Sequence, residues 1–180
     1  MWATLKQVIV KGILGIPAAV VLLDNTFYAA IVQGESMQPL LNPANDTGQD
    51  IVLLSRLRQR SFDYHRGDVV VITSPRDPTS MMIKRVIGLA GDTVRSQPRY
   101  PGDRLVLIPP GHCWIEGDHS SCSLDSNVHG PVPMGLVAAK AVAVIWPVRR
   151  WKILNPDYPR DRVIAKLTSI DYDDDDPDDD

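Results

Sequence analysis

Met82-Ile83-Lys84-Arg85-Val86-Ile87-Gly88-Leu89 decides the fold, because it is a run rich in branched residues that lies between two turn-forming segments. Polar and proline-containing residues 74–80 precede the run, and Gly91-Asp92 follows it, so the run is predicted to be a β-strand. Gly91-Asp92 supplies a turn of positive φ and an aspartate that caps it. Lys84 therefore lies within a strand that we expect to be buried on at least one face.

Six further segments share this character: they are short, apolar and bounded by Gly, Pro or Asp. They are Ile51–Leu54, Val69–Ile72, Thr93–Arg95, Leu105–Ile108, Trp114–Glu116 and Val137–Ile145. The last one is rich in alanine and is also compatible with a helix, but its alternation favours a strand. The 15 prolines and 12 glycines fall almost entirely in the connections, which argues against a helical body. We predict a mainly β protein, with a compact antiparallel barrel-like core.

The first 29 residues are predicted to form an N-terminal membrane-anchoring helix. Val8 to Leu23 is mostly apolar, but its longest uninterrupted run, Gly12 to Leu23, has only 12 residues. A helix that crosses a bilayer needs about 20. Lys11 can extend its charge toward one interface, and Phe27 and Tyr28 suit the opposite one. A targeting peptide and a buried core helix stay open as alternatives.

The chain is divided into the anchor at 1–29, a folded body at 30–156 and a C-terminal segment at 157–180. The net charge is −3, yet residues 171–180 hold eight Asp and no Lys or Arg, so the rest of the chain carries +5. The acidic end is expected to be solvated and disordered, because like charges repel. No basic run with interleaved aromatic residues occurs, which argues against nucleic acid as a partner.

A second segment, Gly34-Glu35-Ser36-Met37-Gln38-Pro39, offers a serine nucleophile on an irregular connection. Serine is a weak nucleophile at neutral pH and needs a base. Lys84 is the candidate base, because burial lowers the pKa of a lysine and leaves a neutral amine that can accept a proton. Gly34 allows a substrate backbone to come close. Taken singly, however, Ser36 is typical of a turn serine and Lys84 of a strand lysine.

Four segments, taken in order, resemble the sequence boxes of the type I signal peptidases. They are Ser36–Leu41, Gly67–Val70, Lys84–Gly88 and the stretch from Gly117-Asp118 to Ser126. The resemblance implies that residues 30–156 form a Ser/Lys peptidase catalytic domain, with Ser36 as nucleophile and Lys84 as general base. It implies that the hydroxyl of Ser123 orients the lysine amine and that Asp125 is a structural acid near the site. The Ser36 backbone N–H would hold the oxyanion.

The sequence departs from many bacterial members at two positions. Gly34 stands where those enzymes carry a serine that donates a second hydrogen bond to the oxyanion, and Asn127 stands where the family commonly has arginine. The stretch between Lys84 and Gly117 is too short for the additional β-domain of some bacterial enzymes. With a single short anchor, the chain most resembles the mitochondrial inner membrane protease branch of the family.

This resemblance implies a single-pass protein of the mitochondrial inner membrane whose catalytic domain faces the intermembrane space. It implies contact with the lipid bilayer, a heterodimer with the related protease subunit 1, and precursor proteins bearing sorting presequences as substrates. No cofactor is expected. Val32, Met37 and Ile83 flank the proposed site and are predicted to form a shallow apolar pocket for a small side chain. An extended presequence is expected to pair as a strand along 33–34 or 82–83.

Three other interpretations use overlapping residues. A zinc-binding domain would use five side chains that fall within 18 residues but lack a paired-ligand spacing, namely His112, Cys113, His119, Cys122 and His129. A triad of Ser36 with His65, His119 or His129 lacks a Gly-x-Ser-x-Gly elbow. A catalytically silent, membrane-tethered β-domain would stabilise a partner subunit. Cys113 and Cys122 are compatible with one disulfide or with two free thiols.

Overall fold

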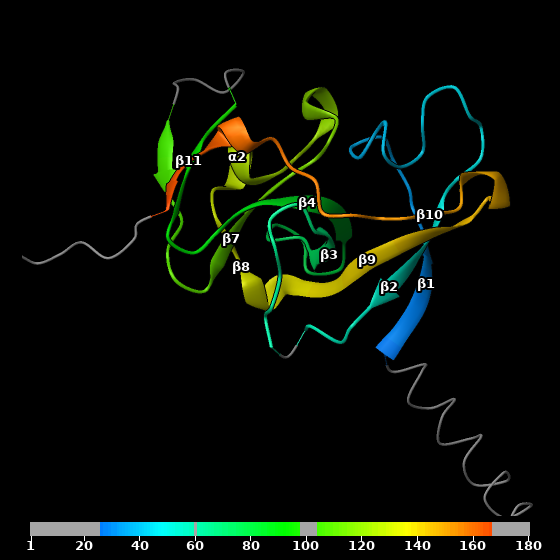
Figure 1. The fold of residues 1–180 in the computed structure, drawn as a ribbon, viewed down its shortest axis with the longest axis horizontal. Coiled ribbons are helices and arrows are strands. Elements are labelled where there is room, and N and C mark those ends of the chain that lie inside the picture. The colour runs from blue at the N-terminus through cyan, green and yellow to red at the C-terminus, as the bar shows by residue number, and fades with distance from the viewer. Residues whose placement is uncertain (1–25, 60, 98–103, 167–180) are drawn as a thin grey trace, which may run out of the picture.

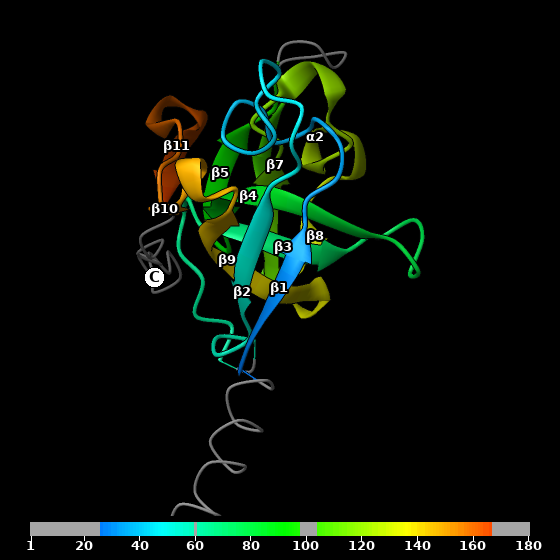
Figure 2. The same ribbon diagram turned by 90° about the vertical axis from the view of Figure 1, so that its right-hand side faces the viewer.

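The computed structural model describes residues 26–59, 61–97 and 104–166, and its strands form two antiparallel sheets (Figures 1 and 2). The larger sheet has the order β1-β2-β9-β3-β4-β7-β8, and β10 also pairs with β9. Its strands are β1 (Phe27–Ile31), β2 (Ile51–Ser55), β3 (Val69–Thr73), β4 (Met81–Leu89), β7 (His112–Glu116), β8 (Val132–Pro133), β9 (Val137–Trp146) and β10 (Lys152–Ile153). The smaller sheet has the order β11-β5-β6, formed by Val163–Lys166, Asp92–Arg95 and Leu105–Leu107.

Helices are short in the described part of the chain. They are α2 (Ser126–His129) and the 3-10 turns η1 (Ser120–Cys122), η2 (Met134–Leu136), η3 (Val148–Arg150) and η4 (Arg160–Arg162). None of the helices within the described residues has the length and apolar character needed to cross a membrane. Residues 1–25 of the anchor predicted at 1–29 lie outside the described residues, as does the acidic end at 171–180.

The prediction of a mainly β body is confirmed, and each of the seven predicted strands is present within two residues of its expected ends. Val137–Trp146 is a strand, as its alternation indicated. The sheet curls (Figure 2), but β1 and β8 stand at its two ends and do not pair with each other among the described residues. The core is therefore an open, curled sheet rather than a closed barrel.

Strand β1 changes the expected boundary of the folded body. Phe27 pairs with Ser55 and Ile31 pairs with Ile51, so residues 27–29 belong to the sheet and not to an anchor. Phe27 and Tyr28, expected at a membrane interface because aromatic side chains suit that position, are instead residues of β1. At the other end, β11 comes from the segment 157–180 and pairs with β5. The folded body therefore extends beyond both limits of 30–156.

Strand β3 is buried on both faces and divides the core. Val69 and Val71 pack into one apolar cluster, with Met37, Val52 and Leu54 among its members. Val70 and Ile72 point the other way, into a cluster with Val86, Cys113 and Ile115. Since successive side chains of a strand alternate between faces, the neighbouring strand β4 also presents its residues to both sides. This alternation sends Lys84 and Arg85 into different environments.

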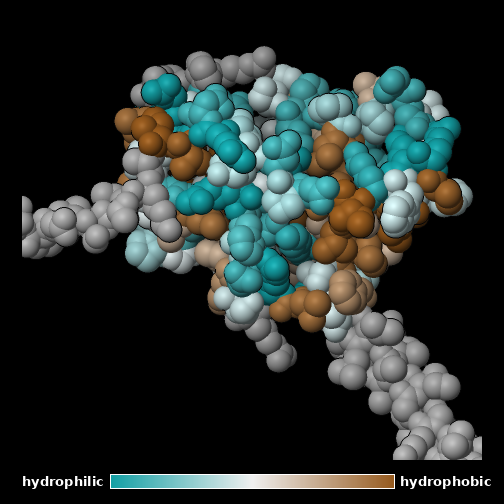
Figure 3. Space-filling model, viewed as in Figure 1, coloured by the Kyte–Doolittle hydropathy of each residue, from teal (hydrophilic) through white to brown (hydrophobic). Residues whose placement is uncertain are grey.

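Apolar side chains are exposed at one end of the larger sheet. Ile31 lies opposite Ile51, which lies opposite Trp146 on β9. Ile31 and Trp146 are both more than half exposed, as are Trp151 and Ile153 nearby in sequence. Figure 3 shows an apolar band on the side of the molecule where β1 and β2 lie. The sheet thus has an apolar surface at this end, outside its core.

Candidate active site

Ser36 and Lys84 lie in contact with each other beside the middle of β4. The Lys84 amine donates a hydrogen bond of 2.7 Å to the Ser36 hydroxyl oxygen. Lys84 comes from the middle of β4 and is only 4% exposed, whereas Ser36 lies in the turn that follows β1. Gly34 opens this turn with a φ of +82°, a left-handed conformation that favours glycine. The structure therefore brings together the two residues that the sequence singled out.

The pKa of Lys84 is lowered from its ordinary value, chiefly because burial disfavours the charged ammonium. The negative charges of Asp125 and Asp118 act in the opposite direction and raise this pKa, but they do not outweigh the burial. Because of the lowered pKa, a larger fraction of the Lys84 amine is neutral at a given pH than for a lysine in water. A neutral amine at this distance can accept the proton of the Ser36 hydroxyl.

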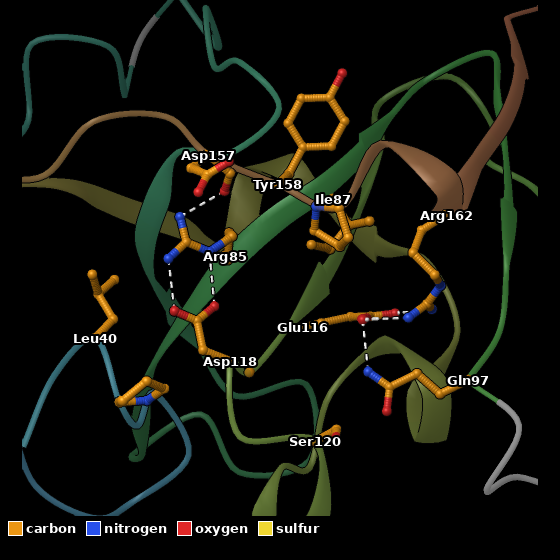
Figure 4. A pocket seen from close by; sticks show the side chains of 13 residues that line it. Leu40, Arg85, Ile87, Gln97, Glu116, Asp118, Ser120, Asp157, Tyr158 and Arg162 are labelled. Carbon is orange, nitrogen blue, oxygen red and sulfur yellow. Dashed lines mark hydrogen bonds and ion pairs between the residues drawn. The ribbon is translucent and has the colours of Figure 1, made fainter. Parts of the chain in front are cut away.

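Arg85 points to the opposite face of β4, as strand alternation predicts. Its guanidinium donates two hydrogen bonds to the Asp118 carboxylate, of 2.7 and 2.6 Å, and one of 3.0 Å to the carbonyl of Gly67 (Figure 4 shows the Asp118 pair). The bidentate pair fixes Asp118 in place. The arrangement thus keeps the two adjacent cationic side chains apart and holds a carboxylate close enough to affect Lys84.

The Ser36 turn is held by a polar residue that the sequence analysis did not identify. The Asn42 side chain donates to the carbonyls of Val32 and Gly34, at 2.9 and 3.2 Å. Asn42 and Asp50 also accept hydrogen bonds from each other's backbone amides, at 2.8 and 2.7 Å. Asn42 has a φ of +48°, which suits asparagine better than most residues. Only its location in an irregular connection that contains Pro43 and Gly48 indicated such a role.

A second segment packs directly against Ser36. The His119 amide donates a 3.1 Å hydrogen bond to the Ser36 carbonyl. Gly117 approaches so closely that an added Cβ would lie well inside van der Waals contact of that same carbonyl oxygen. Within the described residues, no acceptor takes the Ser36 amide hydrogen. The turn is therefore anchored through its carbonyl, and its N–H stays available.

Ser123 and Asp125 support this second segment. The Gly117 amide donates to the Ser123 hydroxyl and to the Asp125 carboxylate, at 3.1 Å in each case. Asp125 also caps helix α2 by accepting from the Asn127 amide at 3.0 Å. Both side chains are buried. The hydrogen bond of the Lys84 amine goes to Ser36 and not to Ser123 among the described residues, so the orienting role of Ser123 stays a prediction.

A cavity of about 290 Å³ opens beside Ser36 and is largely apolar. Val32 and Ile83 line it, with Ala30, Val71 and Met82 among the other contributors. Met37 was expected there too, but its side chain packs into the core with 2% exposure. The direction of a side chain in an irregular turn does not follow from strand alternation, which explains the difference. The cavity lies between β1 and the first half of β4.

A second cavity, of about 550 Å³, lies on the Arg85 side of β4 (Figure 4). Four of its charged side chains pair with one another: Arg85 pairs with Asp118, and Arg162 pairs with Glu116 at 2.6 Å. Gln97 donates a further hydrogen bond of 2.8 Å to Glu116. The contribution of this cavity wall to the Ser36 site is the carboxylate of Asp118, whose charge acts on Lys84.

The histidines and cysteines of the zinc interpretation do not gather into one group. His112 contacts the carbonyl of Pro110 through a ring nitrogen, and Cys113 is buried in the core. Cys113 and Cys122 are both free thiols. His119 contacts Ser36 through its backbone amide, and no histidine ring among the described residues bonds to the Ser36 hydroxyl. The geometry therefore favours Lys84 as the partner of Ser36.

Residues 5–106 match the family described as "Signal peptidase, peptidase S26". The chain belongs to this family. A relative named mitochondrial inner membrane protease subunit 2, from Danio rerio, is 46% identical over 82% of this chain and 79% of its own length. Subunit 1 of the same-named protease from Schizosaccharomyces pombe is 39% identical over 80% of this chain and 96% of its own length.

Among solved structures, a signal peptidase I from Enterococcus faecalis matches with a TM-score of 0.39 and 22% identity. The match covers 43% of this chain and 96% of that one. Membership of the S26 family makes the chain a peptidase, as the four sequence boxes indicated. The resemblance to the inner membrane protease branch is also confirmed, because relatives named subunit 2 match at 37–46% identity over most of the chain.

Proposed function

We propose that this chain is a membrane-anchored serine endopeptidase in which Ser36 is the nucleophile and Lys84 the general base. The observation that carries the proposal is the 2.7 Å hydrogen bond between a buried amine and a serine hydroxyl. Neutral Lys84 takes the hydroxyl proton while Ser36 Oγ attacks the substrate carbonyl carbon. The protonated amine then gives its proton to the leaving peptide amine, and an acyl-enzyme remains. Water completes the hydrolysis with the same base.

The oxyanion of this reaction is assigned to the Ser36 N–H, which has no acceptor among the described residues. Gly34 has no side chain that can add a second donor. Ser123 and Asp125 are assigned supporting roles through Gly117, the residue that contacts the Ser36 carbonyl. Removing one donor of such a site lowers kcat by about 10²–10³ in known enzymes. The turn that presents Ser36 is thus part of the catalytic apparatus and not only its support.

The substrate is assigned as an extended chain, and the small side chain before the cut is assigned to the 290 Å³ cavity. The edges of β1 and of residues 81–83 face this cavity and have no strand partner on that side within the described residues. An extended peptide can pair with such edges through its main chain. A shape-based pocket discriminates by about 1–3 kcal/mol per methylene. We therefore assign a preference for small residues.

By similarity to relatives named mitochondrial inner membrane protease, the chain is assigned to that membrane, with the catalytic domain in the intermembrane space and residues 1–29 as a single-pass anchor. A heterodimer with subunit 1 and presequence-bearing precursors as substrates complete the assignment. A subunit 1 also matches this chain, which is consistent with two related partners.

The deciding experiment compares Ser36→Ala and Lys84→Met with the wild type, each co-purified with subunit 1. Presequence peptides with a small residue before the cut are the substrates. Each variant is expected to lose cleavage, by about 10²–10⁴-fold for the loss of the base, while its thermal unfolding stays cooperative. Lys152→Met is the matched control, since Lys152 is exposed and donates its hydrogen bond to the Leu40 carbonyl and not to Ser36. Full activity in either site variant contradicts the dyad and favours a silent domain.

A further inference from the structure

Three potential metal ligands lie together beside the nucleophile, on two segments that the fold joins. Glu35 precedes Ser36, whereas His119 and Cys122 flank the short turn η1. One ligand atom from each of the three lies within 4.8 Å of the others. These residues belong neither to the substrate cavity nor to the Ser36–Lys84 contact. They form a separate cluster, which we call the Glu35 cluster (Glu35, His119 and Cys122).

The histidine of this cluster carries an unexplained polar atom. His119 Nδ1 is shielded from solvent and has no hydrogen-bond partner among the described residues. Buried polar atoms are nearly always hydrogen-bonded, so one without a partner calls for an explanation such as an ion. Coordination by this nitrogen would satisfy it. The observation is independent of the clustering of the three side chains and also points to a ligand.

The donor set suits zinc. Cysteine sulfur, imidazole nitrogen and carboxylate oxygen are the three ligand types of Zn²⁺ in proteins. Tetrahedral bonds of about 2.0–2.3 Å place ligand atoms roughly 3.3–3.8 Å apart. The three ligand atoms lie within 4.8 Å of one another, and this upper limit exceeds the separation in a tetrahedral zinc site by about 1 Å. Glu35 and Cys122 are exposed, so rotation of their side chains can close this gap, while the His119 amide stays bonded to Ser36.

We propose that Glu35, His119 and Cys122 form a Zn²⁺-binding site that ties the Ser36 turn to the segment around η1. Three protein ligands leave a fourth position for water, as in open zinc sites. The bound ion joins segments that are otherwise linked here by the hydrogen bond between His119 and Ser36. The proposal does not depend on the peptidase chemistry, because it concerns binding alone. It also differs from the five-residue zinc interpretation, of which only His119 and Cys122 remain.

Thiol alkylation tests the site directly, since Cys122 is exposed while Cys113 is 1% exposed. The full chain, co-purified with its partner, is treated with iodoacetamide with and without ZnCl₂, and Cys122 modification is followed by mass spectrometry. Zn²⁺ is expected to slow alkylation of Cys122 at least about tenfold, whereas Mg²⁺ does not protect, because it prefers oxygen ligands. Cys113 serves as the internal control in the same digest. An unchanged Cys122 rate with Zn²⁺ overturns the proposal.

Variants identify the ligands. In Glu35→Gln and in His119→Gln, the Zn²⁺ concentration needed to protect Cys122 is expected to rise at least about tenfold. Loss of even an outer partner of a metal ligand lowers metal affinity by about 10–100-fold. His112→Gln is the matched control and is expected to protect like the wild type. Co²⁺ adds a second readout: a thiolate-to-metal absorption band is expected in the wild type and is lost in Cys122→Ser. Protection that persists in both Glu35→Gln and His119→Gln, or that is lost in His112→Gln, contradicts the site.

Discussion

Gly117 faces the backbone of Ser36 so closely that no side chain fits between the two residues. An added Cβ at position 117 would lie well inside van der Waals contact of the Ser36 carbonyl oxygen and 2.5 Å from Ser123 Oγ. The next segment of chain then bonds to the same carbonyl through the His119 amide. The position of Ser36 is thus set by a glycine that is distant in sequence, as well as by its own turn.

Gly117→Ala is therefore expected to displace the Ser36 turn. A misplacement of about 1 Å at a reacting group lowers the rate by about 100-fold, and overpacking of this kind costs about 1–3 kcal/mol of stability. Peptide cleavage and urea unfolding measure the two effects. Gly135→Ala is the control, since a Cβ there meets nothing within 4 Å. A Gly117→Ala enzyme with wild-type kcat would mean that this packing does not position Ser36.

The pH profile of kcat/KM reports the free enzyme's base. Lys84 must be neutral to accept a proton, and burial lowers its pKa. We expect activity to rise with pH along a limb centred below the ordinary lysine value of 10.5. The same shift affects stability: the unfolded chain binds the Lys84 proton more tightly, so stability rises with pH between the folded and the unfolded pKa. Lys84→Met should abolish both the activity and this part of the stability rise; a rise that persists unchanged contradicts the assignment.

Asp125→Asn tests the charge that acts on Lys84. The Asp125 carboxylate raises the pKa of Lys84 against the effect of burial. Its removal is therefore expected to move the limb of the pH profile to lower pH. Asparagine is as good an N-cap as aspartate, so helix α2 should persist. It has a single acceptor oxygen, however, so the Gly117 amide loses its bond to residue 125 and stability should fall by about 1–3 kcal/mol. Asp161→Asn, an exposed change on η4, is the control and should leave the profile in place. A limb that moves to higher pH would contradict the electrostatic role.

The strands could be predicted from sequence because their signal is local, whereas the residues that hold the site depend on contacts between distant segments. The run around Lys84 is recognisable from its neighbours alone. Strand β1 was missed because only three polar residues separate it from the apolar stretch that ends at Leu23, and only its pairing with β2 distinguishes it from an anchor. Asn42 acts on the carbonyl of Val32, ten residues earlier, and no periodicity indicates that contact. The dyad itself came from family resemblance, since neither residue alone has a distinctive pattern.

Asp92 is expected to be important for stability rather than for activity. Its carboxylate is fully buried and accepts two hydrogen bonds from Arg66, of 2.7 and 2.5 Å, and one of 2.8 Å from the Leu89 amide. Breaking a buried pair by removing one partner costs about 3–5 kcal/mol. Asp92→Ala should therefore lower the urea midpoint strongly. Asp63→Ala, whose ion pair with Arg58 is exposed, should cost about 1 kcal/mol or less. Equal losses in the two variants would contradict this ranking.

Ile83 tests whether the 290 Å³ cavity selects the residue before the cut. Its half-buried side chain lines that cavity next to Ser36. Ile83→Ala removes three carbon atoms from the cavity wall and so makes room for a larger side chain. A pocket of this kind discriminates by about 1–3 kcal/mol per methylene. The kcat/KM of a peptide with leucine before the cut should therefore rise at least about tenfold relative to that of a peptide with alanine there. Leu136→Ala, in the other core cluster, is the control for a loss of packing alone. If the leucine-to-alanine ratio is unchanged in Ile83→Ala, or rises equally in Leu136→Ala, the cavity does not bind this side chain. A ratio that changes only in Ile83→Ala, with the alanine peptide still cleaved, assigns the specificity to the wall formed by β4.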